Sequence, residues 1–168
     1  MPISLRNRLE DRAWTLKEWV QGRPLGHPSH PLFVHFPIAF YTAVLVFDLM
    51  TRIDPNPGLV QASTYLLLGA ALATVFLAIT GLVDWFTMVK GSSKRRIATW
   101  HLSLQVSAAV FFQTSLVLRF GSRTQPEAET TWIVLEVIGY LILVVGQYLG
   151  GVLVYEKAMR VSTGGAAD

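Results

Sequence analysis

Four histidines are the residues of this sequence whose type and spacing could do chemistry: His27, His30, His35 and His101. A neutral imidazole binds haem iron or a transition metal through one of its ring nitrogens. Cysteine is absent, which excludes disulfides, iron–sulfur clusters, covalently attached haem and thiolate nucleophiles. The chemistry that the sequence offers is therefore ligation by imidazole.

His35 and His101 occupy matched positions near the start of two apolar stretches that we expect to begin on the same side of a membrane. At about 1.5 Å of rise per residue, both imidazoles lie roughly 6–8 Å below the start of their helices. Side chains that face one another inside a helix bundle are how such folds hold cofactors. We predict that His35 and His101 bind one haem b, because the paired histidines of a two-haem protein are absent.

A single metal ion is the alternative ligand. His27, His30 and Asp84 are of the types that bind Zn, Cu or Fe. Pro28 and Pro31 are expected to keep the segment between the first two histidines from being an ordinary helix. A third alternative is that nothing binds and that each imidazole hydrogen-bonds a neighbouring helix.

The histidines must be positioned by long apolar stretches, over residues 32–50, 62–83, 97–118 and 132–155. Each is long enough to cross about 30 Å of hydrocarbon. Hydrophobic residues make up 52% of the chain and charged residues 15%, with a mean hydropathy of +0.43. The sequence therefore predicts an all-α integral membrane protein, with a four-transmembrane-helix bundle over residues 25–160.

Residues 1–24 form a separate N-terminal arm. Between Ser4 and Val20, apolar residues recur at three- and four-residue steps opposite charged ones, and Trp14 and Trp19 suit the lipid headgroup region. We predict an amphipathic interfacial helix there; packing against the soluble face of a partner protein is the alternative. Residues 161–168 are expected to be a flexible tail.

The basic residues predict the topology. Of the 14 Lys and Arg residues, all but Arg52, Arg119 and Arg123 lie in the arm, in the loop after the second stretch or at the C-terminus. By the positive-inside rule this side is cytoplasmic. We expect a multi-pass protein of a bacterial cytoplasmic (inner) membrane, with both termini in the cytoplasm and with anionic lipid at that face.

On the opposite side, Asp48 and Glu136 lie inside the membrane ends of the first and fourth stretches, level with the three remaining arginines. Charges at membrane depth are costly and pair with one another or reach to water. Ion pairs are the expected role, and a proton path is the alternative.

Gly146 and Gly150 form a GxxxG motif, whose small residues allow membrane helices to approach closely. The motif serves either the inside of the bundle or an interface with another subunit. The sequence contains no nucleophile–base pair, no phosphate loop and no nucleic-acid motif. We therefore expect neither an enzyme nor a nucleic-acid-binding protein.

The run from His27 to Ile38, His-Pro-Ser-His-Pro-Leu-Phe-Val-His-Phe-Pro-Ile, resembles the opening signature of the domain-of-unknown-function 2231 family of bacterial membrane proteins. Three later segments are similar to that family in the same order: Gly81-Leu-Val-Asp84-Trp85, Arg95-Arg96 before His101, and Gly150-Gly151-Val-Leu-Val-Tyr155. The resemblance implies a four-helix membrane protein, some relatives of which accompany redox proteins. It also marks Asp84, Trp85 and Tyr155 as structural or interface residues. The chain departs from the pattern at Lys157-Ala158, where the family has His-Gly.

Two hypotheses of function follow. The first is a haem b- or metal-binding component of a membrane electron-transfer system. The second is a non-catalytic accessory or structural subunit of a larger redox or photosynthetic membrane complex, a role that is compatible with a bound haem. The gathered histidines favour the first, and the absence of a catalytic set in the sequence favours the second.

Overall fold

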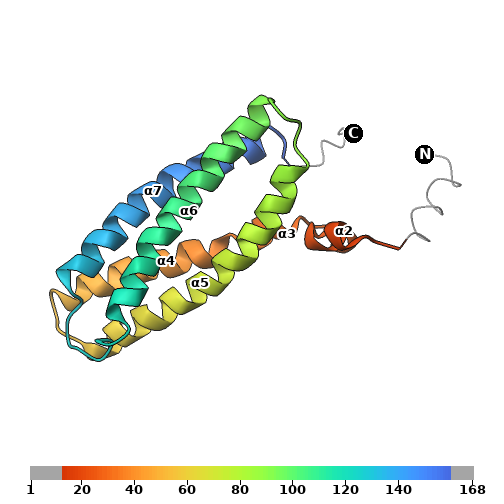
Figure 1. Cartoon of the computed structure of the whole chain (residues 1–168). Coiled ribbons are helices and arrows are strands. Elements are labelled where there is room, and N and C mark those ends of the chain that lie inside the picture. The colour runs from red at the N-terminus through yellow and green to blue at the C-terminus, as the bar shows by residue number, and fades with distance from the viewer. Residues whose placement is uncertain (1–12, 160–168) are drawn as a thin grey trace, which may run out of the picture.

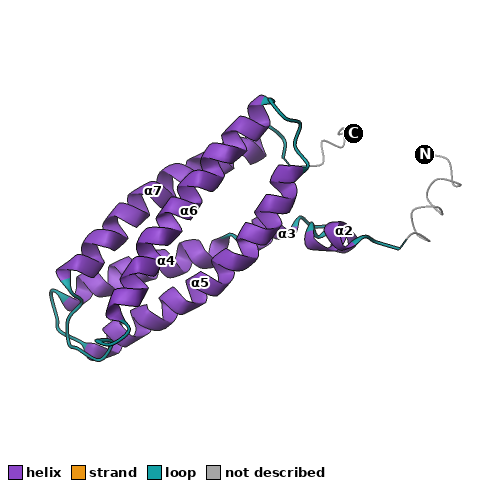
Figure 2. Ribbon diagram, in the orientation of Figure 1, coloured by secondary structure: helices purple, strands orange, loops and turns teal. Residues whose placement is uncertain are grey.

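The computed structural model describes residues 13–159, and within them every regular element is a helix (Figures 1 and 2). Three short helices come first and four long ones follow. In chain order they are α2 (Leu16–Val20), the 3-10 helix η1 (Arg23–Leu25), α3 (Ser29–Phe33), α4 (His35–Thr51), α5 (Pro57–Phe86), α6 (Ser93–Arg119) and α7 (Thr130–Tyr155).

Four helical segments are long and apolar enough to cross a membrane: Ser29–Thr51, Pro57–Phe86, Ser93–Arg119 and Thr130–Tyr155. The first joins α3 and α4, which are separated only by Val34. This confirms the predicted four-helix membrane fold. The helices extend past most ends of the predicted apolar spans because polar residues just outside the apolar stretches cap them. Asn56, for example, precedes Pro57 and accepts a hydrogen bond from the Gly58 N–H.

The long helices run up and down, so that α4 pairs with α5 and α6 pairs with α7 (Figure 1). One end of the bundle contains α3, the end of α5, the start of α6 and the end of α7. We call it the histidine end, because His30 and His101 lie there. The other end contains the α4–α5 and α6–α7 connections. We call it the acidic end, after Asp48 and Glu136.

Each long helix buries one stripe of residues. On α4 the stripe is Pro37, Tyr41, Val44, Asp48 and Thr51. The steps alternate between three and four residues, as in the seams of coiled coils and four-helix bundles. On α7 the same spacing buries Trp132, Glu136, Gly139, Leu143 and Gly146. The stripe therefore decides which polar side chains enter the bundle.

The apolar core lies in the middle of the bundle and holds the two hairpins together. Tyr41 of α4 stacks on Phe112 of α6, with ring centroids 4.0 Å apart. Phe112 also fills the space beside Gly139, where an added Cβ would lie 3.1 Å from its ring. Apolar side chains outside the stripes are exposed, such as Leu72 at 76% and Val117 at 73%. These outer faces are the surfaces available to lipid.

The described part of the N-terminal arm, residues 13–24, packs on the histidine end. Most of the predicted Ser4–Val20 helix, and the predicted tail over residues 161–168, lie outside the described residues. Of this predicted helix, the described residues show only Leu16–Val20 as helical. The helix begins there because the Thr15 side chain caps it. The buried side chains of this segment are polar: Glu18 lies within the helix, and Gln21, which follows it, donates a hydrogen bond from Nε2 to Asp84 Oδ1 at 3.2 Å. Leu16 and Trp19 are exposed, which leaves apolar side chains facing outward.

Candidate functional site: two inward histidines

His30 lies in the first turn of α3. The expectation that the prolines prevent an ordinary helix here is only partly right. His27 stays outside a helix, but Ser29–Phe33 is α-helical. Pro28 precedes the helix, and Pro31 falls in its first turn, where a backbone N–H has no intrahelical partner to lose. The helix directs His30 toward α5.

The His30 ring packs on the backbone of α5. Its Nδ1 lies 3.0 Å from Thr80 Oγ1, and a Cβ added at Gly81 would lie 3.1 Å from its Cε1. The Thr80 hydroxyl donates its hydrogen to the carbonyl of Leu77 at 3.1 Å. Thr80 Oγ1 is therefore the acceptor, and His30 donates from Nδ1. This assignment leaves Nε2 as the unprotonated nitrogen of the neutral ring.

His101 of α6 is held on α7 in the same way. Its Nδ1 lies 2.7 Å from the carbonyl oxygen of Gly146, which can only accept. A Cβ added at Gly150 would lie 3.0 Å from the ring's Cε1. His101 therefore also carries its proton on Nδ1 when neutral, and its Nε2 is a free acceptor.

The two hairpins thus place their histidines alike. The His30 ring lies against Gly81 of α5, and the His101 ring lies against Gly150 of α7. Both rings are partly buried, and His30 is within electrostatic range of His101 and Asp84. In the part of the chain that the structure describes, both rings contact an oxygen through Nδ1, and His30 also has a hydrogen bond to the backbone of Leu77. We call His30 and His101 the two-histidine site.

His35 does not join His101. It is exposed on α4, two residues before the buried Pro37. At about 100° per residue, this places it roughly 200° around the helix from the buried stripe. His27 is also exposed, with Nδ1 3.2 Å from the carbonyl oxygen of Leu25. Sequence reasoning from depth alone therefore chose His35, although His30, seven residues before Pro37, continues the stripe.

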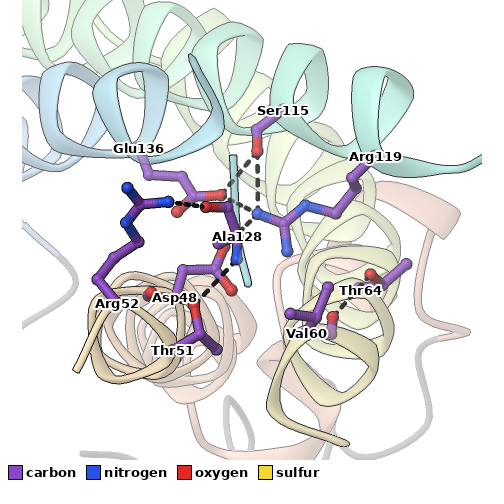
Figure 3. A network of polar contacts seen from close by, with 9 residues as sticks. All are labelled: Asp48, Thr51, Arg52, Val60, Thr64, Ser115, Arg119, Ala128 and Glu136. Carbon is purple, nitrogen blue, oxygen red and sulfur yellow. Dashed lines mark hydrogen bonds and ion pairs between the residues drawn. The ribbon is translucent and has the colours of Figure 1, made fainter. Parts of the chain in front are cut away.

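At the acidic end, three ionisable side chains meet with none of their surface exposed (Figure 3). Arg119 of α6 donates from Nη2 to Asp48 Oδ2 of α4 and to Glu136 Oε1 of α7. The ion pairs expected from the sequence are confirmed for these residues. Arg52 forms a separate pair with Glu127, 3.3 Å away, near the surface.

Over residues 26–163 the chain matches the family described as a predicted membrane protein, DUF2231. The chain belongs to the DUF2231 family. No match was found among the curated proteins or among the solved structures. The family and the four apolar helices together make the chain a multi-pass integral membrane protein.

The other residues that resembled DUF2231 signatures have structural contacts. Trp85 donates from Nε1 to Thr99 Oγ1 at 3.0 Å, and the guanidinium carbon of Arg95 lies 4.0 Å from the centre of its ring. Asp84 is buried and accepts the hydrogen bond of Gln21. Tyr155, in contrast, is 89% exposed. Gly146 and Gly150 face His101 and its neighbour Gln105, so the GxxxG motif is used inside the bundle.

The predicted metal ligands of this DUF2231 protein do not form one cluster. Among residues 13–159, no group of three or more His, Asp or Glu side chains is arranged to hold a metal ion. His27 faces outward, whereas His30 and Asp84 point into the histidine end, on α3 and α5. The arrangement instead offers two imidazole nitrogens, and the Gln105 amide nitrogen, buried without a hydrogen-bond partner, one turn from His101.

Proposed function

We propose that this membrane protein binds one haem b through His30 and His101 and carries electrons within a membrane redox system. The observation that supports the proposal is the shared state of the two rings. Each donates from Nδ1 to a fixed oxygen and leaves Nε2 unprotonated. Histidines that bind iron have this arrangement, because the bond at the other nitrogen fixes the tautomer and the ring plane.

The number of ligands favours haem over a bare metal ion. A porphyrin supplies four nitrogens, so that two imidazoles complete the coordination of its iron. A structural zinc site needs about four protein ligands, and a catalytic one about three. Two inward imidazoles meet the need of a haem. The iron of a bound haem would supply reversible one-electron transfer.

The residues around the two-histidine site have clear tasks under this proposal. Thr80 Oγ1 and the Gly146 carbonyl orient the rings and increase the basicity of their Nε2 atoms. Gly81 and Gly150 keep the space next to each ring clear of a side chain. An open cavity of about 380 Å³ lies at the same end, lined by Asp84, by five residues between Thr87 and Lys94 and by Met159, and neither His30 nor His101 lines it. The apolar helices below exclude water.

The same proposal places the histidine end at the cytoplasmic face of a bacterial inner membrane. Lys90, Lys94, Arg95, Arg96 and Lys157 all lie at that end. A cytoplasmic excess of Lys and Arg is the rule for inner-membrane proteins. The electron donor or acceptor would then meet the protein, and anionic lipid would contact it, on the cytoplasmic side.

A reduced-minus-oxidised absorption spectrum of the protein purified in mild detergent tests the proposal. We expect the Soret and α bands of a six-coordinate haem b in the wild type, and their loss in His101→Ala. His27→Ala is the matched control, because His27 is exposed, and its spectrum should equal that of the wild type. A well-folded, colourless wild-type protein from haem-sufficient cells would contradict the proposal.

The accessory-subunit hypothesis predicts a different result. A colourless protein that co-purifies at fixed stoichiometry with a larger redox or photosynthetic complex would favour it. Part of its support came from the small residues of the GxxxG motif. These glycines pack against side chains of α6, so they do not supply an outer docking face.

A further inference from the structure

The buried charges at the acidic end do not balance. Asp48 and Glu136 contribute two carboxyl groups and Arg119 one guanidinium, and all three side chains are fully buried (Figure 3). A lone net charge inside a bundle is strongly unfavourable, and an ionisable group usually becomes neutral instead. Two carboxyl groups that share one site do not both ionise readily.

No other cation in the described residues compensates for the extra carboxylate. Arg52 pairs with Glu127 and is half-exposed, and the exposed Arg123 donates to the carbonyl of Phe120. From α5, the helix packed on the same layer, only the hydroxyls of Ser63 and Thr64 are buried at this level. The remaining ionisable groups of the two nearby connections, Asp54 and Glu129, are acidic and exposed.

The carboxyl groups of Asp48 and Glu136 lie close together, because Asp48 Oδ2 and Glu136 Oε1 both accept from the same nitrogen, Nη2 of Arg119. Two ionised carboxylates this close to each other repel, and a proton on one of them removes the repulsion. One oxygen of each, Asp48 Oδ1 and Glu136 Oε2, is buried without a partner. These two atoms are available to carry a proton and to accept it.

We propose that Asp48 and Glu136 share one proton, and that with Arg119 they form a proton-binding site inside the acidic end of the bundle. The protonated pair is neutral with Arg119, since one carboxylate balances one guanidinium. Ser115 donates from Oγ to Glu136 Oε1 at 2.7 Å, which stabilises negative charge on that oxygen. The unpartnered Arg119 Nε and Nη1 and Ser63 Oγ, all buried, point to a polar interior through which the proton can exchange.

Infrared spectroscopy of the protein in lipid tests this site directly, independently of any haem. We expect the C=O stretch of a protonated carboxyl at neutral pH, with a small shift in D₂O that shows exchange. Either Asp48→Asn or Glu136→Gln should remove the band, because the remaining carboxyl is then balanced by Arg119. Glu127→Gln and Asp84→Asn are the controls and should keep it.

Two results would overturn the proposal. One is a folded wild-type protein without the protonated-carboxyl band at neutral pH. The other is a band that persists in both Asp48→Asn and Glu136→Gln. If a variant does not fold, ¹³C labelling of the aspartate and glutamate carboxyls in the wild type decides the question: the band must shift with the label, and a band that does not shift contradicts the site.

Discussion

Gly150 and Gly151, two adjacent glycines of α7, have different surroundings. A Cβ at Gly150 would lie 3.0 Å from Cε1 of His101, closer than side chains normally approach. A Cβ at Gly151 would meet nothing nearer than the Tyr155 ring at 4.0 Å. The first glycine therefore sets the position of His101, whereas the second leaves room for a methyl group.

We predict that Gly150→Ala destabilises the protein relative to Gly151→Ala by about 1–3 kcal/mol, the usual penalty of overpacking. The gain of about 1 kcal/mol from alanine in a helix is common to both variants and cancels in the comparison. Unfolding in detergent with added denaturant measures the difference. Equal stabilities would show that Gly150 does not contact the ring as described.

The sequence predicts which residue types form the buried ion pairs and the histidine site, but it does not predict for every residue whether the side chain faces the inside of the bundle. Asp48, Glu136 and Arg119 were expected to pair, and they do, because charges at membrane depth have few other partners. Depth along the helix favours His35, but the direction of a side chain also depends on its angle around the helix, which favours His30. The spacing from His30 to Pro37 and Tyr41 contained the missing information.

At the scale of helices, Arg119 connects three of the four long elements at one point. It reaches from α6 to Asp48 of α4 and Glu136 of α7, and its guanidinium carbon lies 4.7 Å from the centre of the Trp132 ring. No apolar side chain could satisfy these groups. The contact thus fixes how the α4–α5 hairpin sits against the α6–α7 hairpin.

Arg119→Met should therefore destabilise the bundle by about 3–5 kcal/mol, the range found when one partner of a buried ion pair is removed. Arg52→Met is the control: its pair with Glu127 is near the surface, so we expect about 0–1 kcal/mol. Thermal unfolding of both variants in the same detergent gives the comparison. A similar, small effect for both would mean that Arg119 does not hold the hairpins together.

The sequence predicts that the four long helices exist, but it does not predict which helices and segments contact one another. Four apolar stretches with turn residues between them predicted four helices. The short helix α3 was missed because Pro28 and Pro31 indicate a break, and its role in placing His30 was missed with it. Likewise, the burial of Gln21 against Asp84 depends on a contact between the arm and α5 that no local pattern in the sequence contains.

For the whole molecule, the up-and-down order of the helices puts α3 and the end of α7 at one end (Figure 1). Most of the basic residues that the structure describes lie at that end, among them Lys90, Lys94, Arg95 and Lys157. The bundle is therefore polar along its axis, with imidazoles at one end and buried acids at the other. The orientation of this axis in the membrane decides which compartment each site faces.

The absence of cysteine from the sequence makes the orientation measurable. Asp54→Cys marks the α4–α5 connection and Ser93→Cys marks the start of α6, and both positions are exposed. In intact bacterial spheroplasts, a membrane-impermeant maleimide should label the first and not the second. Permeabilised cells should label both. Labelling of Ser93→Cys alone in intact spheroplasts would reverse the proposed orientation.

The most direct test of the central claim compares two histidines that are close in sequence but differ in direction. The reduced-minus-oxidised spectrum should lose its haem bands in His30→Ala, because that ring faces the interior with an unprotonated Nε2. It should be unchanged in His35→Ala, because that ring is exposed on the outer side of α4. Loss of the bands in His35→Ala with full retention in His30→Ala would contradict the site described here.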